Sequence, residues 1–174
     1  MPIIKRGCTI KKLLLILALV VSPAIYANEE PEVVFHNFNW GTKMEDFTKK
    51  MGKPAYTEEI DGLQSLVYDN LTISGYQAFM VAYFSKNGLE GGTYYFNTFS
   101  LDELMQCYKD MQKELLGKYG PTVLCDGIIK EMRPYETSWN LKNGYVYLKV
   151  NTRHNEPVTL WYSSPYLTKK LMGS

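Results

Sequence analysis

Two short segments of this chain each carry a complete helix signal, with a start, an apolar stripe and a stop. In the first, residues 41–54 with the sequence GTKMEDFTKKMGKP, Thr42 and Glu45 have the three-residue spacing of a capping box. Gly52 favours the left-handed backbone that ends a helix, and Pro54 prevents its continuation. The apolar residues of this segment recur at spacings that place them on one helical face; they are Trp40, Met44, Phe47 and Met51.

The same signal occurs a second time, over a segment about twice as long. Ser100 and Glu103 form the second capping box, and Gly120 and Pro121 form the second stop. The apolar stripe between them is Leu101, Leu104, Tyr108, Met111, Leu115 and Tyr119. Because both helix signals are followed by strand-like sequence, the chain is predicted to repeat one helix-then-sheet unit.

After each proline the hydrophobic period changes from helical to alternating, which is typical of strands. Three turn signals, Asp61-Gly62, Asn87-Gly88 and Asn143-Gly144, favour tight hairpins. The predicted strands are residues 55–60, 63–69, 76–84, 89–96, 122–130, 137–141, 145–150 and 158–162.

The predicted fold is therefore of the α+β class. Two tandem α-then-β-hairpin repeats form one antiparallel sheet of about eight strands, with the helices packed on one face. The first repeat covers about residues 38–98 and the second about residues 99–165. Residues 28–174 have the length of a single domain with one core.

The first 27 residues have the layout of a secretory signal peptide. A positive stretch precedes the apolar run Leu13 to Val21, Pro23 breaks the run, and Ala27 is a small residue at a cleavage site. The run is shorter than the roughly 20 residues that a membrane-spanning helix needs. We expect residues 1–27 to be removed and residues 28–174 to be periplasmic or secreted, with no transmembrane anchor after cleavage. An uncleaved amphipathic anchor is the alternative.

Charge and motifs argue against several function classes. Residues 28–174 hold 15 basic and 18 acidic side chains, which is not the basic footprint of a nucleic-acid-binding protein. The two histidines, His36 and His154, lack neighbours at zinc-ligand spacing. No phosphate-binding loop, dinucleotide fingerprint or nucleophile elbow is present. We therefore expect no cofactor, no metal and no enzymatic activity, and an enzyme of unknown class remains a minor alternative.

Two cysteines follow the predicted signal peptide, Cys107 and Cys125. Cys107 lies about 18 Å before the end of its predicted helix, at about 1.5 Å per residue. Cys125 lies about 16 Å along the strand after the turn, at about 3.3 Å per residue. If that strand folds back along the helix, the two thiols are level, and an oxidising compartment would join them. The alternatives are two buried free thiols or a catalytic pair of Cys125 with His154.

Tyrosine is unusually abundant, with 14 in the chain. Strand alternation assigns Val146, Leu148 and Val150 to the helix-covered face and their neighbours to the other face. The outward-facing set is predicted to be Tyr145, Tyr147, Lys149, Trp161 and Tyr95. Aromatic and basic side chains of this kind are enriched at protein interfaces, so this set is the candidate partner-binding site. A second structural layer or a dimer partner over the same face is the alternative.

The first helix unit resembles the SmpA/OmlA (BamE-type) family. Gly41, Phe47, Met51, Gly52 and Pro54 stand at that family's spacing, and the run Val81-Ala82-Tyr83-Phe84 before Asn87-Gly88 resembles its strands. The tandem arrangement is similar to the β-lactamase inhibitor protein family, which joins two helix-plus-sheet units into one curved sheet. The resemblance implies this fold, and a role either as an inhibitor-like or adaptor module or as an envelope-assembly scaffold.

The leading hypothesis is therefore an exported binding module whose partner is another protein. An envelope-assembly scaffold differs in that its partner is a membrane-bound complex, so it should sediment with membranes. An enzyme would need a cleft with clustered titratable groups.

Overall fold

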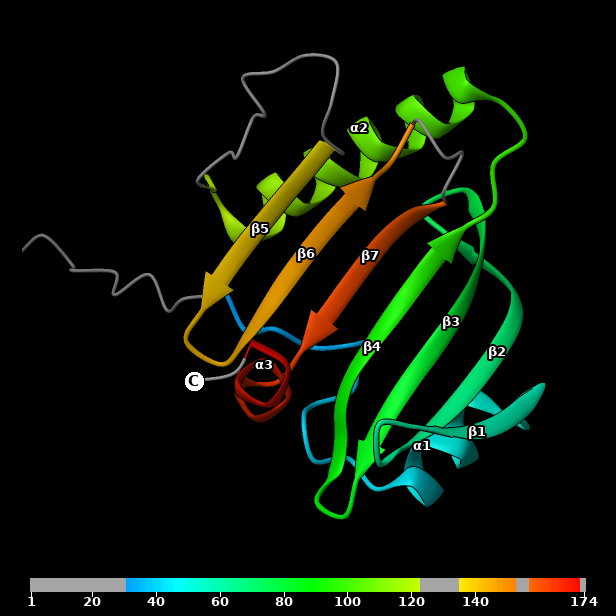
Figure 1. The fold of residues 1–174 in the computed structure, drawn as a ribbon, viewed down its shortest axis with the longest axis vertical. Coiled ribbons are helices and arrows are strands. Elements are labelled where there is room, and N and C mark those ends of the chain that lie inside the picture. Colours follow the sequence, from blue (N-terminus) through cyan, green and yellow to red (C-terminus); the bar gives the residue numbers. More distant parts are fainter. Residues whose placement is uncertain (1–30, 123–134, 153–156, 173–174) are drawn as a thin grey trace, which may run out of the picture.

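The structure is a computed structural model, and it describes residues 31–122, 135–152 and 157–172. The helices are α1 (Met44–Met51), α2 (Leu101–Tyr119) and α3 (Pro165–Met172). The strands are β1 (Tyr56–Ile60), β2 (Leu63–Ile73), β3 (Tyr76–Ser85), β4 (Gly88–Phe96), β5 (Tyr135–Leu141), β6 (Gly144–Val150) and β7 (Val158–Ser163). The strands form one antiparallel sheet in the order β1-β2-β3-β4-β7-β6-β5 (Figure 1).

The predicted α+β class and antiparallel sheet are confirmed. The described residues contain seven strands, and the predicted eighth, residues 122–130, lies outside them apart from Thr122. The hairpins form where the turn signals predicted them, and Asp61 and Gly62 both have positive φ, as a tight primed turn requires. The main difference in length is β2, which continues to Ile73 past an irregularity at Asp69 and Asn70.

The start of α2 is as predicted. The Ser100 hydroxyl accepts a hydrogen bond from the Glu103 amide at 3.2 Å, and the Glu103 carboxylate accepts one from the Phe99 amide at 2.8 Å. All the predicted stripe residues are buried except Leu101, which is 53% exposed because it lies in the first turn, beyond the sheet.

The predicted capping box of α1 is wrong. Lys43 is the N-cap residue and its side chain makes no capping hydrogen bond. The Thr42 hydroxyl instead donates to the Asn39 carbonyl at 2.7 Å. The reason is a backbone contact: the amide of Gly41 and the carbonyl of Thr42 both bond to Leu89 of β4, which pins this loop and turns the Thr42 side chain away from the helix.

Both predicted helices pack on one face of the sheet, which we call the helix face. In α1, Phe47 contacts Phe38, Tyr68 and Phe84. In α2, Tyr119 packs against Trp139 of β5. Figure 1 shows the two helices behind opposite ends of the sheet, with the N-terminal segment crossing between them.

That N-terminal segment covers the central strands. Phe35 is fully buried against Tyr94 and Tyr162, with ring centroids 5.0 Å and 5.8 Å away. A Cβ atom at Gly92 would lie 2.1 Å from the Phe35 ring. The absence of a side chain at Gly92 therefore lets this aromatic ring approach the backbone of the central strands closely.

A third helix, α3, follows β7 and was not predicted. The Ser164 hydroxyl accepts from the Leu167 amide at 3.1 Å, so Ser164 caps α3, and Pro165 occupies the first helical position, where its missing amide costs nothing. Ser164 is also tied to β4, because its hydroxyl donates to the Glu90 carboxylate at 2.6 Å. The Leu167 side chain lies where a Cβ at Gly91 would be, so α3 covers one end of the face opposite the helix face.

Candidate functional site

The five residues predicted to bind a partner lie together on one face of the sheet, opposite α1 and α2. Their alternating neighbours are buried on the helix face; for example, Val146 and Leu148 have no exposed surface and Tyr162 is 8% exposed. The five residues themselves are partly exposed. We call this surface the aromatic face and define it by Tyr95, Tyr145, Tyr147, Lys149 and Trp161, with Phe79 and Tyr83 of β3 added by the structure.

The strand register sets these residues in neighbouring rows across the sheet. Trp161 of β7 stands directly opposite Tyr147 of β6 and Thr93 of β4. In the next row, Tyr95 and Lys149 stand on either side of Thr159. Directly opposed side chains on one face are about 4.5–5.5 Å apart at Cβ, so the members of each row are in contact range.

The rings pack against one another within and between the rows. Phe79 and Tyr95 are stacked, with centroids 4.6 Å apart and planes 14° apart. Tyr145 and Tyr147 have nearly parallel rings 6.3 Å apart. Tyr83 lies 6.4 Å from Trp161. The aromatic side chains therefore hold each other in place, which lowers the entropy that a partner's binding would have to remove.

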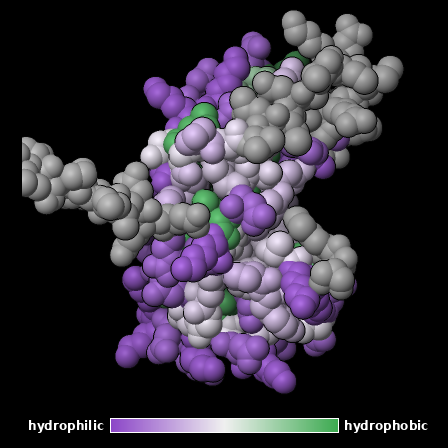
Figure 2. Space-filling model, turned by 90° about the vertical axis from the view of Figure 1, so that its left-hand side faces the viewer, coloured by the Kyte–Doolittle hydropathy of each residue, from purple (hydrophilic) through white to green (hydrophobic). Residues whose placement is uncertain are grey.

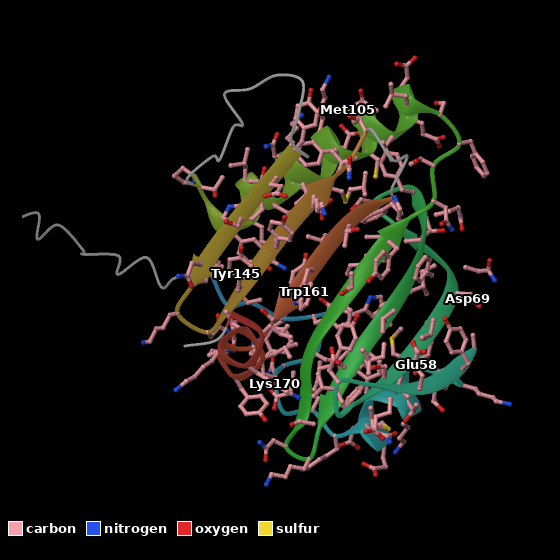
Figure 3. All side chains as sticks on the ribbon, in the orientation of Figure 1. Glu58, Asp69, Met105, Tyr145, Trp161 and Lys170 are labelled. Atoms are coloured by element: carbon pink, nitrogen blue, oxygen red, sulfur yellow. The ribbon has the colours of Figure 1, made fainter. Side chains whose placement is uncertain are left out.

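Trp161 is the centre of this face. Figure 3 shows it on β7, with Tyr145 on the neighbouring strand and Lys170 of α3 below. Its indole nitrogen is buried and has no hydrogen-bond partner among the described residues. An indole N–H is a donor only, and a buried unpaired donor is unfavourable, so this group can still donate to a carbonyl oxygen of a partner that reaches it.

A small apolar pocket of about 90 Å³ adjoins Trp161. Its lining includes Ile60, Leu63, Tyr83, Leu167 and Leu171, so it lies between the β1–β2 hairpin and α3. The Lys170 ammonium donates to the Asp61 carbonyl at 2.8 Å and ties the two walls together. Ile60 and Leu171 are 36% and 47% exposed, so the pocket has an apolar rim.

Two tyrosines of this face, Tyr83 and Tyr147, are uncharged hydrogen-bonding groups at neutral pH because their pKa values are raised. Burial raises the pKa of Tyr83 to about 12. Burial, together with a hydrogen bond from its hydroxyl to the Glu136 carboxylate, raises the pKa of Tyr147 above its ordinary value. Figure 2, which views the side of the molecule that carries β5, shows most hydrophilic surface at the two ends and paler surface with small hydrophobic patches between them.

The cysteine prediction falls partly outside the described residues. Cys107 is fully buried in α2 as a free thiol, and burial raises its pKa to about 12. Cys125 lies outside the described residues, and so does the predicted disulfide between them. His154, the partner in the catalytic alternative, also lies outside them.

Two features of this face were not predicted from the sequence. Phe79 and Tyr83 are odd-numbered in β3 and alternate with Ala78, Met80 and Ala82, which are buried, so strand alternation does carry the signal. The apolar pocket depends on α3, and the pair Ser164-Pro165 is the helix-start signal that could have predicted it.

We also searched the described residues for metal-binding clusters and for membrane-spanning helices. Within it, no group of three or more His, Cys, Asp or Glu residues is placed to hold a metal ion. None of the described helices combines the length and apolar character needed to cross a membrane.

The arrangement belongs to the class of α+β proteins with one antiparallel sheet, and two solved structures are similar to it. One is a DUF4309 family protein from Bacillus subtilis, with 11% sequence identity and a TM-score of 0.47 over 77% of this chain and 86% of that one. The other is an extracellular protein containing an SCP domain from Bacillus anthracis, with 14% identity and a TM-score of 0.43 over 79% of this chain and 50% of that one.

No model of a known protein family matches this chain, and no curated protein sequence matches it either. The resemblance to the SmpA/OmlA and β-lactamase inhibitor protein families stays a prediction. Likeness between solved structures at such low identity concerns the backbone alone, so the function has to come from the residues themselves.

Proposed function

We propose that this protein is an exported binding module that presents its aromatic face to a protein partner, with Trp161 as the central anchor. The observation that carries this proposal is the incomplete cover of the sheet. Both α1 and α2 lie on the helix face, and among the described residues α3 and the tip of the β1–β2 hairpin reach the aromatic face only at one end (Figure 1). The seven aromatic or basic side chains of this face therefore remain partly exposed.

The composition of this surface fits a binding role. Interface centres are enriched in tyrosine and tryptophan, which supply large contact areas at low entropic cost. The Trp161 N–H offers one directional hydrogen bond, and the adjoining pocket accepts one apolar side chain. The partner would thus present an apolar side chain next to a free carbonyl. The layout of residues 1–27 supports a periplasmic or secreted location.

The test is a cross-linking pull-down with tagged protein from envelope and culture fractions, comparing three proteins. The parent should capture a partner, and Trp161→Ala should lose it. Phe99→Ala is the matched control, because Phe99 is 93% exposed but lies outside the aromatic face. Circular dichroism should show that both variants are folded. Equal capture by the parent and by folded Trp161→Ala would contradict the proposal.

The envelope-assembly role uses the same face and differs in the partner. If the captured protein belongs to a membrane-bound complex, this protein should sediment with membranes and should be released by Trp161→Ala. Recovery in the soluble fraction, with a soluble partner, would favour the inhibitor-like or adaptor role.

A further inference from the structure

A second concave site lies on the helix face, on the far side of the sheet from the aromatic face. It is a cleft of about 300 Å³, the lower end of the range for small-molecule sites. Tyr94, Leu160 and Tyr162 form its floor. One wall is α2, and the others are the N-terminal segment at residues 34–37 and the β2–β3 turn at residues 72–74. The cleft is thus the space that α2, the N-terminal segment and the β2–β3 turn leave above the central strands.

The backbone at one wall is in an unfavourable conformation. His36 and Asn37 have φ of 50° and 63°, in the left-handed region that residues with a side chain seldom adopt. A pair of hydrogen bonds between Phe35 and Phe38, at 2.9 Å and 3.1 Å, closes this two-residue turn and holds it. The turn places the His36 Nδ1 atom 2.8 Å from the Tyr94 hydroxyl. Backbone strain maintained in this way is found at binding sites more than elsewhere.

The floor of the cleft also has an unused hydrogen-bonding group. Tyr162 is 8% exposed, lines the cleft, and its hydroxyl forms no hydrogen bond to the described residues. Burial raises its pKa well above the usual value, so the hydroxyl stays protonated and can donate. This hydroxyl can therefore donate a hydrogen bond to a ligand oxygen that enters the cleft.

The charges around the cleft balance. Glu114 and Lys118 lie one turn apart on α2 and carry opposite charges. The Glu114 carboxylate accepts from the Ser74 hydroxyl, and the Lys118 ammonium lies 4.9 Å from the centre of the Tyr119 ring. Burial, and then the charge of Lys50, lowers the pKa of His36, so this side chain is neutral at neutral pH. A charged ligand would lose its hydration here without a net opposite charge to replace it.

We propose that this cleft binds a compact uncharged molecule, with its apolar body against Leu160, Met111 and Leu115 and a carbonyl or hydroxyl oxygen on the Tyr162 hydroxyl. The proposal is independent of partner binding, because it uses the opposite face of the sheet. It assigns His36 and Tyr94 as a second polar contact at the end of the cleft near the strained turn.

The test uses three probes of similar size and measures NMR shifts of the Met111 and Leu115 methyl groups. Acetophenone has a carbonyl, ethylbenzene lacks an acceptor, and benzoate is charged. We expect acetophenone to shift both methyl groups with the lowest dissociation constant of the three. No saturable shift with any probe would overturn the site, and tighter binding of benzoate would overturn its uncharged character.

Two variants locate the contact. Tyr162→Phe removes only the hydroxyl. It should weaken acetophenone binding by roughly fivefold while leaving the affinity for ethylbenzene unchanged. Because that hydroxyl has no partner among the described residues, the variant should keep the parent's melting temperature. Thr72→Trp, at an exposed position on the rim, should block all three probes. An equal loss of affinity for acetophenone and ethylbenzene in Tyr162→Phe would overturn the assigned hydrogen bond.

Discussion

The two faces of the sheet use aromatic residues in opposite ways, although the residues are neighbours in the sequence. Tyr94 and Tyr162 point to the helix face, where they are 5% and 8% exposed and pack around Phe35. Tyr95 and Trp161, one position away, point to the other face and remain partly exposed. The side-chain period of two in a strand is enough to separate them.

The comparison teaches that aromatic content by itself does not identify an interface. On the helix face the rings replace water around a closed core, so their removal should cost stability. On the aromatic face the rings contact mainly one another and solvent, so their removal should cost binding. The four predictions that follow separate these two kinds of contribution.

The largest effect is expected from truncating a ring on the helix face. Phe96 is fully buried in β4, so Phe96→Ala should lower the free energy of unfolding by about 3–5 kcal/mol. Trp161→Ala should lower it by about 1–2 kcal/mol, within the usual range for single substitutions. Urea denaturation followed by circular dichroism measures both. Equal losses would mean that Trp161 belongs to the core.

A smaller loss in the free energy of unfolding is expected at Gly92, where the helix face has no room for a side chain. Gly92→Ala would place a Cβ 2.1 Å from the Phe35 ring, and the overpacking should cost about 1–3 kcal/mol. Combining it with Phe35→Leu, which removes the ring edge, should cost less than the sum of the single changes. Strict additivity in urea denaturation would show that Phe35 does not lie on Gly92.

An effect that appears only at high pH is expected on the aromatic face. The pKa of Tyr83 is about 12 in the folded protein, whereas an unfolded tyrosine ionises near its model value of 10.0. The folded state therefore holds the proton more tightly, and its stability should fall as the pH rises from 10 to 12. Tyr83→Phe should reduce that fall, and Tyr135→Phe, at an exposed position, is the control. The same decline in both variants would contradict the assignment to Tyr83.

The smallest effect on stability is expected when the indole of Trp161 is replaced by a smaller aromatic ring. Trp161→Phe deletes a donor that has no partner among the described residues and one of the two fused rings, so the free energy of unfolding should fall by less than about 1 kcal/mol. Partner binding should still weaken if the N–H donates across the interface. Unchanged binding in a surface-immobilised assay would leave only the ring as the anchor.

The local structure of this molecule was largely open to prediction, because its causes are local. The stop signals at Gly52 and Gly120, the Ser100 cap, the hairpins and the face of each residue in β6 and β7 follow from neighbouring residues. The Thr42 cap failed because a hydrogen-bond partner from β4, far away in the sequence, competes for the same loop.

The sites were predictable only in part. Alternation placed Tyr145, Tyr147 and Trp161 on one face, but it says nothing about which strand lies beside which. The cleft on the helix face is lined by five separate segments, and His36 taken alone showed no metal-ligand spacing. Such a site exists only after the chain has assembled, so no single stretch of sequence contains it.

The strand order has a consequence for the time course of folding. The last strand to be synthesised, β7, lies in the middle of the sheet, where Trp161 pairs with Thr93 of β4 and Tyr147 of β6. Contacts between such distant residues slow folding. A chain that ends before Val158 would leave β4 and β6 with bare edges, which promote association between chains, and light scattering of that truncated chain would measure it. The two halves of the sheet can therefore pair with each other only after β7 has been synthesised.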